Sequence, residues 1–181
     1  MNKFISHLRT VNKHRREVRK LCFKCGLYWQ GITHDLSKYS PAEFINGVKF
    51  YTGKGSPHLG ERKEYGYSKA WLHHKGRNKH HAEYWQDIRP NGHTEPITMP
   101  MKYLAEMVCD RVAACKIYLG DKYTAEAPWN YYDTHRDENQ FNSVTRTILE
   151  FVLCMMRDEG EEAAFQWLRD AVNETKEKLQ F

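Results

Sequence analysis

Apolar residues recur at spacings of three and four along most of this 181-residue chain, as they do on one face of an α-helix. The clearest stripe runs through Val11, His14, Val18 and Leu21, and it predicts a helix over residues 2–25 that ends at Gly26. The same spacing, with Pro or Gly at the boundaries, predicts further helices over residues 41–51, from Pro100 to about 117, over 142–159, and from 161 to about 179. No segment alternates like a β-strand over a useful length, so we predict an all-α fold.

The segments between these helices are less regular. Residues 27–33 are predicted to be a short link, and residues 53–60 and 90–100 to be loops, because they hold several glycines and prolines. The loop at 53–60 could act as a lid over a neighbouring site or be ordinary surface. No element is assigned to residues 120–139. We expect a single helical domain over residues 1–181, with C-terminal helices at 142–179 packed on the preceding part.

The net charge of +5 is unevenly distributed along the chain. Residues 1–89 carry 18 Lys and Arg against 7 Asp and Glu, a balance of +11, whereas residues 90–181 carry 10 against 16, a balance of −6. A basic half favours an anionic ligand such as phosphate, although a nucleic-acid surface has the same bias. The chain has no apolar run of membrane-spanning length, its start does not resemble a secretion signal, and its five cysteines suit reduced thiols. We therefore expect a soluble, cytoplasmic protein with no membrane partner.

The pair His34-Asp35 is the first candidate for chemistry. An imidazole and a neighbouring carboxylate can bind the same metal ion, and the second carboxylate oxygen can bridge to another ion. Directly after the pair, Ser40 and Glu43 flank Pro41-Ala42 in a pattern typical of a capping box at the start of the 41–51 helix. A His-Asp dipeptide also occurs by chance, so further ligands are required.

Two helical stripes supply such ligands. His14 lies between Val11 and Val18 and therefore points toward the interior, where it could bind a metal or simply donate to a carbonyl. Asp110 lies in the apolar stripe of the helix that begins at Pro100. An ionised carboxylate there costs several kcal/mol unless a cation compensates it, either a metal ion or a base such as Arg111.

Four histidines fall within nine residues, at His73-His74 and His80-His81. Gly76 and Asn78 predict a turn between two helices, which would let one imidazole from each helix converge. The alternative is a solvated basic patch that includes Lys75, Arg77 and Lys79. The neighbouring aromatic residues Trp71, Tyr84 and Trp85 favour partial burial.

The order of these residues resembles the HD-domain superfamily of metal-dependent phosphohydrolases, in particular its small, poorly characterised members. The resemblance covers about residues 11–117, and it implies that the single domain is an HD-like helical bundle with its metal-site core in this segment. It implies that one ion is bound by His14, His34, Asp35 and Asp110. It further implies that Asp35 bridges to a second ion, held by His74 and by His80 or His81, and that Lys38 lies near the substrate phosphate.

The resemblance implies a phosphohydrolase that acts on a nucleotide or another small phosphate ester. Asp35 and Lys38 would be the catalytic residues, and Lys38, Arg77 and Lys79 would bind phosphate oxygens. The cofactor would be one or two ions of Mn, Fe, Co, Ni or Zn, because mixed His and carboxylate ligands suit all of these. The Gly-Tyr-Pro signature of the branch that cleaves cyclic dinucleotides is absent after His80-His81.

Two alternative functions remain open at this level. One is a di-iron oxygenase, since the HD-like scaffold also carries oxidation chemistry. The other is a nucleic-acid-binding module without enzymatic activity. Its contacts would be the basic residues Arg15, Arg16, Arg19, Arg77 and Lys79.

Overall fold

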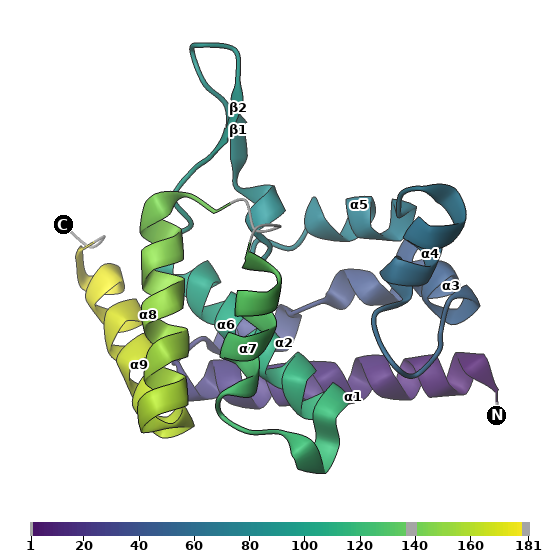
Figure 1. The fold of residues 1–181 in the computed structure, drawn as a ribbon, viewed down its shortest axis with the longest axis horizontal. Helices are drawn as coiled ribbons and strands as arrows, with labels where there is room; N and C mark the ends of the chain where they lie inside the picture. The colour runs from purple at the N-terminus through teal and green to yellow at the C-terminus, as the bar shows by residue number, and fades with distance from the viewer. Residues whose placement is uncertain (1, 137–140, 179–181) are drawn as a thin grey trace.

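The 22-residue helix α1 (Lys3–Lys24) lies across the lower part of the molecule, and most of the other elements lie above it (Figure 1). In the computed structural model, which describes residues 2–136 and 141–178, this helix packs most extensively against α6 (Met101–Leu119). Both helices contribute fully buried residues to one hydrophobic core, among them Val18 and Val108. This α1 and α6 pair places residue 14 beside residue 110.

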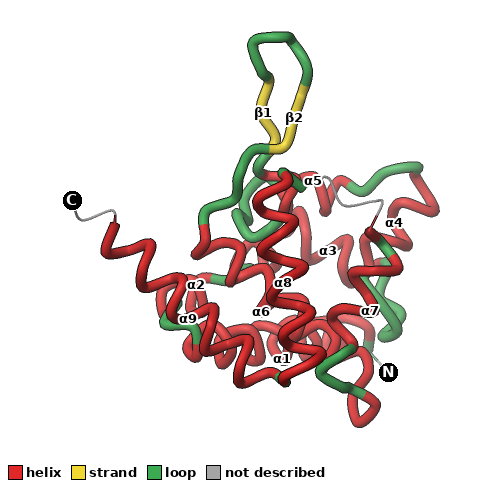
Figure 2. The backbone as a smooth tube through the Cα atoms, turned by 60° about the vertical axis from the view of Figure 1, so that its left-hand side comes forward, coloured by secondary structure: helices red, strands yellow, loops and turns green. Residues whose placement is uncertain are grey.

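The C-terminal part consists of α7 (Ala127–Thr134), α8 (Ser143–Glu159) and α9 (Glu161–Lys178). Helices α8 and α9 pack on each other, and both contact α6. Their buried apolar stripes complete the core. The predicted all-α class is thus confirmed in the described part of the chain, where the small β-hairpin is the only sheet (Figure 2). Residues 137–139 of the unassigned segment and residue 179 of the last predicted helix lie outside the described residues.

Two segments that were predicted to be irregular are helices. Residues 27–33 contain α2 (Tyr28–Thr33), whose only buried residue is Gly31. The apolar side chains of α2 are not buried, so they do not form the apolar stripe from which a helix is predicted. The 53–60 segment leads into α4 (Pro57–Tyr65), whose only buried residue is Glu61. Buried Glu61 accepts hydrogen bonds from Ser68 Oγ (2.5 Å) and from the Lys69 and Ala70 amides (3.2 and 3.3 Å). It thereby satisfies the start of the next helix, an arrangement that a hydrophobicity pattern does not reveal.

Short elements build the region that carries the predicted histidines. The single turn η1 (Leu36–Tyr39) and α3 (Pro41–Lys49) follow α2, and α5 (Lys69–Lys75) follows α4. His80-His81 does not begin a second α-helix as predicted. It is followed by the 3₁₀ turn η2 (Ala82–Tyr84), and a similar turn, η3 (Gly120–Lys122), follows α6.

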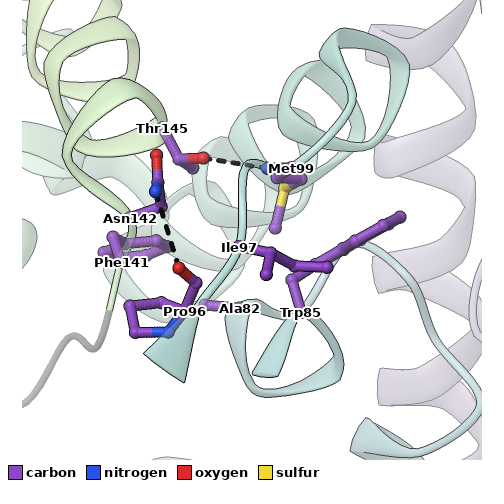
Figure 3. A pocket seen from close by; sticks show the side chains of 8 residues that line it. All are labelled: Ala82, Trp85, Pro96, Ile97, Met99, Phe141, Asn142 and Thr145. Atoms are coloured by element: carbon purple, nitrogen blue, oxygen red, sulfur yellow. Dashed lines mark hydrogen bonds between the residues drawn. The ribbon is translucent and has the colours of Figure 1, made fainter. Parts of the chain in front are cut away.

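The predicted loop at 90–100 is part of a protruding hairpin, in which β1 (Gln86–Ile88) pairs antiparallel with β2 (Thr94–Pro96). Figure 3 shows how its base is attached to the start of α8. The Met99 amide donates to Thr145 Oγ1 (3.0 Å), and Asn142 Nδ2 donates to the Pro96 carbonyl (3.5 Å). The apolar pocket between these contacts has no room for a water molecule, so it is a packing contact.

None of the helices within residues 2–136 and 141–178 combines the length and the apolar character needed to cross a membrane.

Replacing Gly47 with alanine is expected to destabilise the protein by about 1 to 3 kcal/mol, as overpacking typically does. A Cβ atom at this position of α3 would lie 2.2 Å from His7 Nε2 on α1. The His7 ring cannot swing away freely, because it packs against the rings of Phe44 and Tyr51 at centroid distances of 5.1 and 5.7 Å. Thermal unfolding measures the effect. Gly55→Ala is the control, since no atom lies within 4 Å of its added Cβ. Equal melting temperatures for the two variants would contradict the close contact.

Candidate metal centre

Asp35 occupies an unusual turn between α2 and η1. Its φ of 54° and ψ of 27° are left-handed, and it is the only non-glycine residue of the described chain with a positive φ. This conformation costs roughly 1 to 2 kcal/mol for most L-residues, and Asp tolerates it better than most. The turn buries His34 and Asp35 together, at 2% and 1% exposure. An adjacent His and Asp thus both face the interior.

One group of potential ligands surrounds Asp35 Oδ2. It consists of His14, His34, Asp35 and Asp110, each offering one atom within 4.8 Å of the others. His34 Nε2 lies 3.3 Å from Asp35 Oδ2 and 3.4 Å from Asp110 Oδ1. His14 Nε2 lies 2.7 Å from Asp110 Oδ1 and 3.8 Å from Asp35 Oδ2. The structure therefore brings together all four residues that the resemblance assigns to one ion.

A second group surrounds the other oxygen of Asp35. His74 Nε2 and His80 Nε2 lie 3.3 and 3.5 Å from Asp35 Oδ1. His81 belongs to the same group, whose ligand atoms also lie within 4.8 Å of one another. The sequence left open which histidine of each pair takes part. The structure selects His74 over His73 and includes both His80 and His81.

Two buried glutamates, which the sequence analysis did not assign to the site, orient these histidines. Glu106 Oε1 accepts from the Nδ1 atoms of His34 (2.9 Å) and His80 (3.1 Å), and Glu43 accepts from the Nδ1 atoms of His73 and His74 (both 2.7 Å). A carboxylate on Nδ1 fixes the imidazole so that Nε2 is free to bind a metal. One signal could have revealed Glu106, which lies four residues before Asp110 on the same helix face.

The predicted capping box at Ser40 and Glu43 is wrong. The Ser40 side chain makes no capping hydrogen bond, and its Oγ is buried without a hydrogen-bond partner among the described residues. Glu43 turns toward the histidines of α5 and does not reach back to the start of its own helix. A local sequence pattern could not anticipate this tertiary contact.

The charges and free atoms of the site suit a cation. The Nε2 atoms of His34, His80 and His81 are buried and have no hydrogen-bond partner among the described residues. Burial alone would raise the pKa of Asp35, but His34 and Lys38 outweigh it and hold this pKa well below its usual range. Burial lowers the pKa of His34, but Asp35 outweighs burial and raises this pKa well above its ordinary value, so a metal ion would have to displace a proton from His34. Burial and then Lys38 lower the pKa of His14, which favours its neutral, metal-binding form. Unpartnered imidazole nitrogens around ionised carboxylates fit a divalent transition-metal ion.

A cavity of about 1330 Å³ opens onto this centre. Lys38 lines it, with Nζ 2.5 Å from Asp35 Oδ2. Burial lowers the pKa of Lys38, but Asp35 and Asp110 outweigh burial and raise this pKa to about 12. A cationic amine is thus available beside the predicted ligands, as the resemblance implies.

The predicted phosphate contacts of Arg77 and Lys79 are not supported, because neither residue lines the cavity. Arg77 donates to the His73 carbonyl (3.3 Å), and Lys79 Nζ lies over the rings of Tyr84 and Tyr103. The turn that brings His74 and His80 inward leaves these two side chains outside.

Fold and site together define an all-α protein with two overlapping His and carboxylate clusters that share one aspartate. The chain belongs to the family described as "Family of unknown function (DUF5662)", whose model matches residues 3–155 and thus includes every residue of both clusters. No curated protein matches the chain, and no solved structure does.

Proposed function

We propose that this protein is an HD-type, metal-dependent phosphohydrolase that acts on a nucleotide or another small phosphate ester. The observation that supports this most is the position of Asp35, whose Oδ2 faces one group of ligands and whose Oδ1 faces the other. A carboxylate between two cation sites is the arrangement that two-metal hydrolysis requires. The basic cavity above it suits a phosphorylated substrate.

In this proposal each group of ligands binds one ion. One ion of Mn, Fe, Co, Ni or Zn would be held by His14, His34, Asp35 and Asp110, and a second by Asp35, His74, His80 and His81. Bound divalent ions of this kind lower the pKa of coordinated water and so supply hydroxide near neutral pH.

Lys38 and the positioning glutamates would complete the site. Lys38 is protonated at neutral pH and would bind an oxygen of the substrate phosphate from the cavity side. Glu43 and Glu106 would keep the imidazole rings in the orientation that presents Nε2 to the ions.

Metal removal tests the proposal. We expect Mn, Fe, Co, Ni or Zn to raise the melting temperature of chelator-treated protein, because an ion at 100 times its dissociation constant adds about 2.7 kcal/mol to the native state. The same ion should restore phosphate release from a panel of nucleotides and p-nitrophenyl phosphate. If no metal changes the melting temperature, or if phosphate release continues in chelator, the proposal fails.

The same donor set also suits iron, so a di-iron oxygenase is the second candidate. An oxygen-dependent absorbance change of the iron-loaded protein, without phosphate release, would favour it. The nucleic-acid-binding hypothesis loses one of its residues. The Arg15 guanidinium donates to the His34 and Ile32 carbonyls (2.7 and 2.9 Å) and to the Tyr39 hydroxyl (3.1 Å). These hydrogen bonds stabilise the backbone beside His34 and occupy the guanidinium that would contact a nucleic acid.

A further inference from the structure

Several basic side chains line the cavity. Besides Lys38, five of them line it. They are Lys54, Arg62, Lys75, Arg111 and Lys122. Within residues 2–136 and 141–178 none of the five forms an ion pair with a carboxylate, whereas Lys38 pairs with Asp35. Positive charge in this cavity is therefore left for a ligand.

Arg111 is the most informative of the five. Its guanidinium carbon lies 5.9 Å from the ring centroid of Tyr132 and 6.0 Å from that of Phe141, so aromatic side chains hold it in place. Its Nε is buried and has no hydrogen-bond partner within the described residues. An unmatched N–H donor at a buried position is costly, and the two terminal nitrogens of the guanidinium carry further donors for a ligand.

Arg111 does not neutralise Asp110, which was the alternative explanation for that buried carboxylate. Adjacent residues of a helix point about 100° apart. The Asp110 carboxylate faces His14 and His34, and no ion pair joins it to Arg111.

We propose that Arg111 binds a second anionic group of the ligand, a phosphate or carboxylate, while the first phosphate lies at the metal centre. This inference rests on the proposed phosphohydrolase function for the placement of that first phosphate. Arg111 and Lys38 line the same cavity, and Asp110 lines it as well. The planar guanidinium can bind an oxyanion through two parallel N–H bonds.

The size of the cavity agrees with a ligand of this kind. Its volume of about 1330 Å³ far exceeds that of one phosphate ion. The ligand class is therefore a small phosphate ester with a second anionic group, such as a nucleoside bisphosphate.

Phosphate binding to the chelated protein tests the inference without any hydrolysis. Calorimetric titration with inorganic phosphate should show a dissociation constant about tenfold higher for Arg111→Gln, a typical loss for one charge-assisted hydrogen bond. Arg77→Gln removes the same charge outside the cavity and should bind like the wild type. Arg111→Lys keeps the positive charge but not the two parallel N–H donors, so its dissociation constant should lie between those of the wild type and Arg111→Gln. If Arg111→Gln and Arg77→Gln bind phosphate equally, the inference is overturned.

A second measurement separates the two anionic groups. In the metal-loaded protein, Arg111→Gln should raise KM about tenfold for adenosine 3′,5′-bisphosphate and leave KM for adenosine 5′-monophosphate nearly unchanged. Equal increases for both substrates would overturn the role of Arg111 in binding a second group. If the wild type hydrolyses neither, the proposed function fails for these substrates, while the phosphate titration still decides on Arg111. Should Arg111→Gln not fold, Arg111→Lys provides both comparisons.

Discussion

In the proposed two-metal site, replacing Asp35 with asparagine is expected to abolish metal binding while preserving the fold. Asparagine has the same shape and tolerates the left-handed conformation at φ 54°. It lacks the negative charge that both ligand groups share through Oδ1 and Oδ2. Mutating a residue that only hydrogen-bonds to a metal ligand commonly lowers metal affinity 10- to 100-fold. The loss of the shared ligand should therefore lower the affinity about 100-fold or more at each site.

Metal analysis of purified Asp35→Asn, together with circular dichroism and phosphate release, measures this loss. Asp87→Asn is the matched control, because Asp87 lies exposed on the hairpin. The control should keep the metal content and activity of the wild type. An Asp35→Asn protein that retains two ions would show that the carboxylate does not bridge them.

Replacing Glu106 with leucine is expected to weaken metal binding at both groups of ligands, although Glu106 belongs to neither of the two groups around Asp35. Its Oε1 accepts from His34 of one group and from His80 of the other. Leucine fills a similar volume and accepts no hydrogen bond, so both imidazoles lose the partner that orients them. We expect a loss of about 10- to 100-fold in affinity at each site, with glutamine causing a smaller change.

Glu43→Leu provides the comparison for Glu106→Leu. Glu43 supports His74, which belongs only to the second group, and His73, which belongs to neither. Metal titrations followed by calorimetry should therefore show both binding steps weakened in Glu106→Leu and only one in Glu43→Leu. Identical titration curves for the two variants would contradict the assignment of Glu106 to both groups. Unfolding curves in chelator show separately how far each substitution affects the fold.

Much of the helical framework could be predicted from the sequence. The four long helices α1, α6, α8 and α9 follow from the spacing of apolar residues and from Gly or Pro at their boundaries, since helical periodicity is a local property. The short helices α2 and α4 were missed because the side chains they bury are a glycine and a glutamate. The hydrophobicity pattern carries no information about such contacts.

The chain by itself determined which residues could serve as ligands and their order, from His14 through the His34-Asp35 pair to Asp110. Only the tertiary structure decided that the two Asp35 oxygens face different histidines, that Glu43 and Glu106 orient the histidines, and that Arg111 faces the cavity while Arg77 and Lys79 do not. The physical reason is the sequence separation of the residues in contact. Helical spacing depends on neighbours three and four positions away, whereas the contacts of Glu43 and Glu106 with the histidines join residues 26 to 72 positions apart and depend on how the helices pack.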